Sequence, residues 1–181
     1  MKNYKILCIA LLITVLFSCN HNVKQDADIN KIKNLESTLY SDSTKSVKMS
    51  VANDLIMAYA RFATAYPNDT LSAEYLFRAG ELSRAVNMGR QAILYYDKIT
   101  YSFPKYRKIA ICYFLEGFVY ENQMNDILNA KKYYNLFITK FPTHPLVKDA
   151  KVLIENLGKS PEELIKSFEE KQNKSKDSKP I

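Results

Sequence analysis

With 181 residues and a hydrophobic content of 47%, the chain is long and apolar enough for about one domain with its own core. The formal charge is +7, and two of these charges, Lys2 and Lys5, lie in a segment that we expect to be removed, so the mature chain carries 7 − 2 = +5. This mild charge argues against the clustered basic surface of a nucleic-acid-binding protein, and we expect no nucleic acid among the partners.

The first 18 residues have the pattern of a signal peptide. Basic residues near the start precede an apolar run from Ile6 to Phe17, which is too short to cross the ~30 Å bilayer core as a stable helix. The run ends in Leu16-Phe17-Ser18-Cys19, which resembles the lipobox of bacterial lipoproteins. That resemblance implies cleavage before Cys19, acylation of this cysteine by palmitate-type chains, and a lipidated tether over residues 19–28. The alternative is an ordinary secretory signal that contains a cysteine by chance.

The lipobox also carries an expectation about location. Acyl chains contribute about 0.8 kcal/mol per buried CH₂, and two or more chains hold a protein stably on a membrane. Asn20 follows the cysteine, so the aspartate that marks retention at the inner membrane in some bacteria is absent. We therefore expect a protein held at the outer membrane through lipid on Cys19 and facing the periplasm.

Helical spacing of apolar residues predicts an all-α chain of eight helices, since four glycines and six prolines leave little room for sheet hairpins. The first two helices are expected from about Ile29 to Tyr40 and from about Val47 to Tyr66-Pro67. The other six are expected over about residues 70–86, 90–102, 106–122, 126–140, 143–157 and 160–171. Residues 171–181 read as a disordered basic tail, which either solubilises the chain end or touches anionic lipid or polysaccharide.

Capping residues mark several of these boundaries. Ser160 and Glu163 have the spacing of a capping box, and Asp69 or the adjacent threonine is expected to cap the third helix. His144 is expected to be a cap or a surface residue at a helix start, where Pro145 is tolerated in the first turn. Asp69-Thr70-Leu71 also resembles a glycosylation signal used in some bacterial envelopes, although capping is the main interpretation.

The central part of the chain repeats itself. Residues 91–104 align with residues 129–142 at an offset of 38, and both segments end in Phe-Pro. Upstream, Gly80 and Gly117 are 37 residues apart, so one residue has been inserted within the second copy. A fainter earlier copy ends at Tyr66-Pro67. Periods of this length in a glycine-poor chain are typical of stacked helical hairpins.

The residues within each copy resemble the tetratricopeptide pattern. The second copy runs Tyr113-x2-Glu116-Gly117-x2-Tyr120, then Ala130-x3-Tyr134, and reaches Pro142 eight residues later. It departs from the pattern in Tyr113, which replaces tryptophan, and in Glu116, which replaces leucine. The resemblance implies a right-handed superhelix of about four helical hairpins over residues 29–170, in which the aromatic residue after the alanine fills the space between hairpins.

From about Val51 to Gly158 the chain resembles envelope members of this family, on the long repeat, the Tyr/Phe-Pro endings and the segment FPTHPLVKDAKVLIENLG. These are the lipoprotein of the outer-membrane β-barrel assembly machine and the periplasmic Tol-Pal-associated cell-division coordinator. The resemblance implies a lipid-anchored scaffold or adaptor that binds a partner protein or peptide, in outer-membrane protein assembly or envelope maintenance. The alternative is a lipoprotein that captures glycan or peptide for a nutrient uptake system.

In tetratricopeptide proteins the first helix of each hairpin lines a concave groove. The positions that this resemblance assigns to ligand contact are Glu74, Phe77, Glu81, Arg84, Ile111, Phe114, Phe118 and Glu121. The three phenylalanines would form an apolar strip flanked by charge, which suits an extended peptide or a partner helix. The residues leave open the alternative that these phenylalanines are buried against neighbouring helices or the C-terminal segment.

The sequence gives no basis for catalysis. Its two histidines have no Cys, His or carboxylate partner at metal-ligand spacing, and there is no glycine-rich phosphate loop and no nucleophile elbow. We expect no enzyme activity, no cofactor and no metal. Once Cys8 leaves with the signal peptide and Cys19 is acylated, Cys112 is the remaining thiol, and its apolar surroundings predict a small buried side chain.

Overall fold

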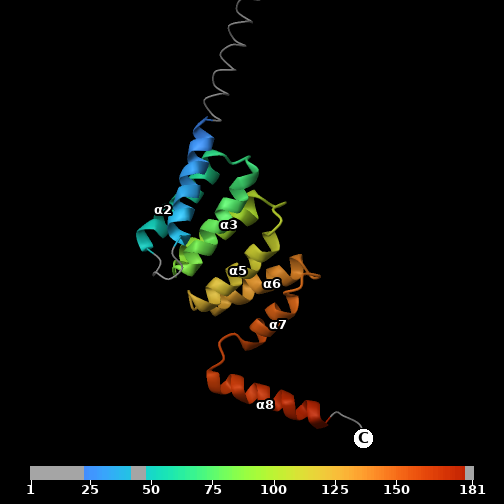
Figure 1. The fold of residues 1–181 in the computed structure, drawn as a ribbon. Helices are drawn as coiled ribbons and strands as arrows, with labels where there is room; N and C mark the ends of the chain where they lie inside the picture. Colours follow the sequence, from blue (N-terminus) through green and yellow to red (C-terminus); the bar gives the residue numbers. More distant parts are fainter. Residues whose placement is uncertain (1–22, 42–47, 178–181) are drawn as a thin grey trace, which may run out of the picture. The chain divides into compact units, whose positions relative to one another are not determined.

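The computed structural model describes residues 23–41 and 48–177, and the regular structure in these residues is entirely helical (Figure 1). The predicted signal peptide and Cys19 lie outside the described residues. The described part contains eight helices, as predicted. The first spans residues 23–40, and the others are α2 (Met49–Ala65), α3 (Thr70–Ala85), α4 (Gly89–Ser102), α5 (Ile109–Asn122), α6 (Ile127–Lys140), α7 (Val147–Asn156) and α8 (Pro161–Asp177).

The chain divides into two compact units between Tyr106 and Arg107. In the first unit, α3 packs against both α2 and α4, and Figure 1 shows α3 beside α2. In the second unit, α6 packs against both α5 and α7. Consecutive helices therefore pair within each unit, while a continuous superhelix over residues 29–170 stays a prediction.

The glycine of each repeat makes room for a tyrosine ring. A Cβ atom placed on Gly80 would lie 2.5 Å from Cε1 of Tyr96, and one placed on Gly117 would lie 2.6 Å from Cδ1 of Tyr134. Both tyrosines are fully buried. The resemblance predicted that this aromatic residue fills the space between hairpins. It instead packs inside its own hairpin, because the glycine leaves space for it on the paired helix.

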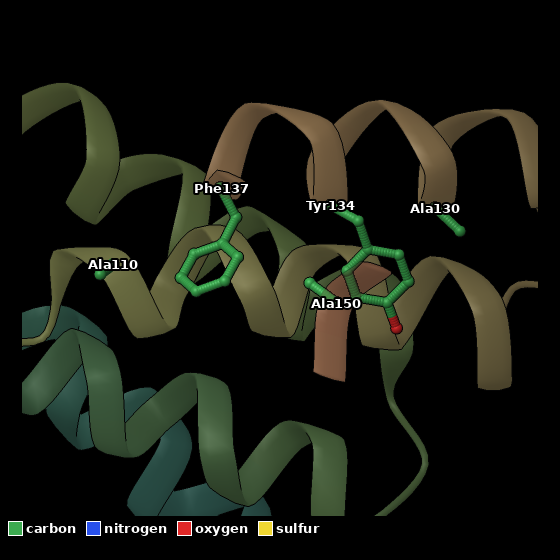
Figure 2. Packing of buried hydrophobic residues seen from close by; sticks show 5 residues of the cluster. All are labelled: Ala110, Ala130, Tyr134, Phe137 and Ala150. Carbon is green, nitrogen blue, oxygen red and sulfur yellow. The ribbon is translucent and has the colours of Figure 1, made fainter. Parts of the chain in front are cut away.

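Each unit has its own apolar core. In the first unit, the ring of Phe62 packs against those of Tyr66 and Tyr75, with centroids 4.7 and 4.8 Å apart. Figure 2 shows the centre of the second unit, where Tyr134 and Phe137 point from α6 toward α5. Small residues surround these two rings. They are Ala110, Ala130 and Ala150.

The turns that join paired helices use a left-handed asparagine. Asn87 follows α3 with φ 60°, and Asn125 follows α5 with φ 51°. The two residues are 38 apart, so they occupy the same place in the repeat. Asparagine tolerates this backbone conformation better than most residues with a side chain, which explains its place after a helix end.

The first helix begins earlier than predicted. Residues 23–28, expected to be part of the tether, are helical. The reason is tertiary: the Tyr66 hydroxyl donates to Asp28 at 2.8 Å, and the Gln25 amide donates to Asp69 at 2.5 Å. These bonds fix the polar start of the helix to the first unit.

The third helix begins as predicted. Asp69 is the N-cap of α3, and its carboxylate accepts from the backbone N–H of Leu71 at 2.7 Å. This bond satisfies one of the free donors at the helix start.

The C-terminal boundaries differ in two places. The helix expected from residue 143 begins only at Val147, because residues 142–146 form turns in which the Leu146 N–H donates to Nδ1 of His144 at 3.2 Å. His144 was predicted to be a cap or a surface residue; it is half-buried and stabilises the turn before α7, whose N-cap is Leu146. The last helix, α8, continues to Asp177 although disorder was predicted from residue 171, and no glycine or proline interrupts residues 171–177.

The start of α8 confirms the predicted capping box. The Glu163 N–H donates to Oγ of Ser160 at 3.2 Å, and the Ser160 N–H donates to the Glu163 carboxylate at 2.8 Å. The apolar residues of α8 are only partly buried, since Leu164 is half-buried and Ile165 is 60% exposed.

Candidate functional site

The predicted groove residues fall in both units, and four of them, Glu74, Phe77, Glu81 and Arg84, lie on α3 in the first. Phe77 is half-buried, and its ring lies 6.1 Å from that of Tyr96 and 6.2 Å from that of Tyr106. Glu81 accepts a hydrogen bond from the Tyr96 hydroxyl at 2.5 Å. The Arg84 guanidinium donates twice to the same carboxylate, at 3.3 and 3.2 Å. Phe77, Glu81 and Arg84 therefore form one aromatic and ionic cluster around Tyr96.

The other four predicted groove residues lie on α5 in the second unit. The ring of Phe114 lies 5.6 Å from that of Tyr134 and 5.5 Å from that of Phe137, so Phe114 borders the core. Glu121 accepts from the Tyr134 hydroxyl at 2.7 Å. Ile111 and Phe118 are half-buried.

The position of Phe77 and Phe114 bears on the alternative that the sequence left open. Both rings pack against the second helix of their own hairpin, and both are half-buried. Each therefore helps to hold its hairpin together.

Carboxylates on the first helix of a hairpin recur as hydrogen-bond acceptors for tyrosines, of which Tyr59, Tyr96 and Tyr134 are buried and Tyr106 is half-buried. Tyr59 donates to Glu36 at 2.6 Å, and Tyr106 donates to Glu74 at 2.7 Å, in addition to the bonds of Tyr96 and Tyr134. Burial, followed by the hydrogen bond to the carboxylate, raises the pKa of Tyr59, of Tyr96 and of Tyr134 well above the ordinary value. These tyrosines therefore stay neutral donors, and the acidic groups serve the packing of the hairpins.

One arginine links two of these carboxylates. Arg78 on α3 donates to Glu36 at 2.7 Å and to Glu74, four residues earlier on the same helix, at 3.4 Å. Burial alone would lower its pKa, but the hydrogen bond and charge of Glu36 raise it. The pair fixes the first helix to α3 while half of the arginine side chain stays exposed.

Two residues singled out in the sequence are buried in the second unit. Cys112 is a fully buried thiol on α5, as predicted. Glu116, which replaces the usual leucine, is also fully buried, so this carboxyl group occupies a core position. Sequence reasoning recorded the replacement but did not predict the burial.

Two hollows lie beside α2 in the first unit. One, of about 270 Å³, lies between the first helix and α2 and has a mixed lining of Asp28, Lys31, Leu35, Asp54, Met57, Ala58, Arg61 and Phe62. The other, of about 370 Å³, lies between α2 and α4 and is mostly apolar, with a lining of Met57, Ala60, Arg61, Thr64, Ala65 and Tyr95. Neither was predicted, because both depend on how these helices pack.

No group of three or more His, Cys, Asp or Glu side chains among the described residues is placed to hold a metal ion. None of the described helices has the length and apolar character needed to span a membrane. Comparison of the chain with protein-family models and with curated proteins finds no match.

Proposed function

We propose that this protein is a lipid-anchored scaffold of the bacterial envelope, with tetratricopeptide-like hairpins that bind a partner protein or peptide. The observation that carries the proposal is the repeated hairpin, in which a glycine and a buried tyrosine recur with half-buried Phe77 and Phe114 on the first helix. A repeat of this kind offers an extended surface built from successive helices. The lipobox around Cys19 supports a membrane location, with outer-membrane protein assembly or envelope maintenance as the expected setting.

The anchor is tested by replacing one atom. Cys19→Ser removes the thiol that would carry lipid while leaving the rest of the chain unchanged. We expect the wild-type chain to incorporate labelled palmitate and to sediment with membranes, and the variant to lose both properties. A variant that stays firmly in the membrane fraction would contradict lipid anchoring at this cysteine.

The groove is tested with a photo-crosslinking phenylalanine analogue, which preserves the aromatic contacts. The analogue replaces Phe77 or Phe118 in intact cells, and the control places it at the exposed Thr139 on α6. We expect one envelope protein to be captured at both groove positions and not at the control. Equal capture at Thr139, or none at the groove, would place partner binding on another surface.

A second function, capture of a small ligand, is favoured by the hollow between the first helix and α2. Its two carboxylates and two cations around Leu35 and Met57 suit a zwitterionic ligand such as a short peptide. If this function holds, a short peptide raises the melting temperature of the purified protein, and Arg61→Ala removes the shift. A scaffold alone responds only to its protein partner.

A further inference from the structure

The hollow between α2 and α4 continues into an exposed apolar stripe. Leu94 and Tyr101 on α4 are 61% and 89% exposed, and both share a helix face with Lys98 between them. The Lys98 ammonium donates to Oγ1 of Thr64 at 3.3 Å, and Thr64 lines the hollow. The stripe on α4 therefore borders the hollow on α2.

The fold does not require apolar residues along this stripe. At the repeat offset of 38, Leu94 corresponds to Lys132 on α6, and Tyr101 corresponds to Thr139. Both α6 residues are exposed and polar, as expected for the outer side of a helix. The first unit thus exposes a leucine and a tyrosine to solvent at positions where the second copy of the repeat has a lysine and a threonine.

The charged side chains that line the hollow or contact its lining are basic. Arg61 is the charged residue in the lining of the hollow. Lys98 lies at the edge of the hollow, because it donates to Thr64, which is part of the lining. Neither of these cations forms an ion pair with another of the described residues. Arg61 also lines the neighbouring hollow, where Asp28 and Asp54 supply carboxylates, and the exposed Asp97 precedes Lys98 on α4. A ligand that fits here brings an apolar group to the floor and negative charge to the rim.

We propose that the α2/α4 surface, formed by the hollow of about 370 Å³ with Leu94, Lys98 and Tyr101, docks an acidic polypeptide segment that carries apolar side chains. The hollow accommodates one or two side chains, and the two cations meet carboxylates beside them. An anionic membrane is a poorer fit, because surface attraction to lipid headgroups relies on clusters of four or more basic residues. This surface is separate from the predicted groove residues on α3, and it stands whether or not those residues bind a partner.

The test uses the purified full chain and three labelled peptides followed by fluorescence anisotropy. One peptide alternates glutamate with leucine, the second replaces every glutamate by glutamine, and the third replaces every leucine by serine. We expect the glutamate–leucine peptide to bind at least about tenfold more tightly than either of the others. Failure of this peptide to bind, or equal binding of the glutamine–leucine peptide, would overturn the proposal.

Variants of exposed residues locate the binding. Leu94→Ser with Tyr101→Thr removes both exposed apolar side chains without adding charge and should abolish peptide binding at an unchanged melting temperature. The control, Leu128→Ser on α6, removes a leucine that is 84% exposed and should leave binding intact. Loss of binding in the control to the same extent would mean that any exposed leucine attracts the peptide, which overturns the proposal.

Charge reversal separates a peptide partner from a membrane. Arg61→Glu with Lys98→Glu should make the chain prefer a lysine–leucine peptide to the glutamate–leucine peptide. Vesicles of phosphatidylglycerol provide the competing surface. If the wild-type chain binds these vesicles but not the glutamate–leucine peptide, and the charge-reversed variant loses vesicle binding, the surface serves a membrane and the proposal is wrong.

Discussion

The hairpin of α3 and α4 and the hairpin of α5 and α6 are two copies of one sequence pattern, and they differ in an instructive way. Both retain a glycine that faces a buried tyrosine ring and an asparagine in the left-handed turn. The carboxylate that accepts from the tyrosine has moved. Relative to the glycine it is one residue on at Glu81 and four residues on at Glu121, so the acceptor has shifted by about one helical turn.

This difference separates two kinds of constraint. The glycine cannot change without displacing an aromatic ring, because a Cβ atom would overlap it in both copies. The tyrosine hydroxyl needs only an acceptor within reach, and successive turns of the facing helix supply one. The outer faces of α4 and α6 differ most, and there a leucine and a lysine occupy equivalent positions. The close contact with the ring preserves the glycine, whereas hydrogen bonding and surface positions leave a choice.

The largest expected effect concerns the residue at the centre of each hairpin. Phe137 and its counterpart Ile99 are both fully buried. Phe137→Ala should cost about 4 kcal/mol and Ile99→Ala about 3 kcal/mol, because each leaves a cavity in a packed core. The free energy of unfolding is measured by urea denaturation. Phe137→Ile, which gives the second copy the residue of the first, is the control, and an equal loss in this variant would contradict the cavity explanation.

The next largest effect concerns the contact between the glycine and the tyrosine of each hairpin. Gly80→Ala and Gly117→Ala should each destabilise the protein by about 2 kcal/mol, although alanine favours a helix, because the new methyl group collides with the tyrosine ring. Tyr96→Leu in the Gly80→Ala background should recover part of the loss, since leucine lacks the ring. Additive losses in the double variant would mean that the ring is not the obstacle.

The tyrosine hydroxyls come next. Tyr96→Phe and Tyr134→Phe should each cost about 1.5 kcal/mol, because each removes a hydrogen bond to a carboxylate and leaves the packing of the ring intact. If the acceptor position is free to move, as the comparison indicates, the two losses should agree closely. Thermal or urea unfolding measures both. A negligible loss in one copy would show that its bond contributes no stability.

A similar contact, between Tyr66 and Asp28, makes the stability of the protein depend on pH in the alkaline range. Burial and then the hydrogen bond to Asp28 raise the pKa of Tyr66 from its usual 10.0 to about 12. The neutral tyrosine is thus favoured in the folded state, so this contribution to stability is complete below pH 10 and is lost as the pH rises toward 12. Tyr66→Phe should make the fall in melting temperature over this range shallower. An identical fall would exclude Tyr66 as its source.

The smallest expected effect lies in the turns. Asn87→Ala and Asn125→Ala should each cost about 1 kcal/mol, because alanine is strained in the left-handed conformation that both residues adopt. Glycine at either position should be neutral or slightly stabilising. Urea denaturation measures the free energy of unfolding of the alanine and glycine variants, and their difference gives the cost of backbone strain. Equal free energies of unfolding would contradict this explanation.

Much of the fold follows from local pattern. The apolar spacing and the recurrent Phe-Pro endings mark the ends of α4 and α6 to the residue, and the offset of 38 identifies equivalent positions. The start of the first helix could not be predicted in this way, because residues 23–28 are polar and are held by tertiary bonds from Tyr66 and to Asp69. The division of the chain after Tyr106 has no local signature either.

The candidate site was less accessible to prediction. Phe77 and Phe114 were chosen from family spacing, which does not reveal that each also packs against the partner helix of its hairpin. Leu94 and Tyr101 were missed although a signal was present. Comparison of exposed positions at the repeat offset pairs them with Lys132 and Thr139, and that contrast can be read without a structure.

The contact between glycine and tyrosine also indicates how distant homologues of this chain can be detected. Because the glycine admits the ring and the ring excludes any larger residue, a lineage that loses one must alter the other. The separation is 16 residues from Gly80 to Tyr96 and 17 from Gly117 to Tyr134, and in each case a proline stands eight residues beyond the tyrosine. We therefore expect a glycine, tyrosine and proline at this spacing to persist in relatives whose overall sequence identity to this chain is low.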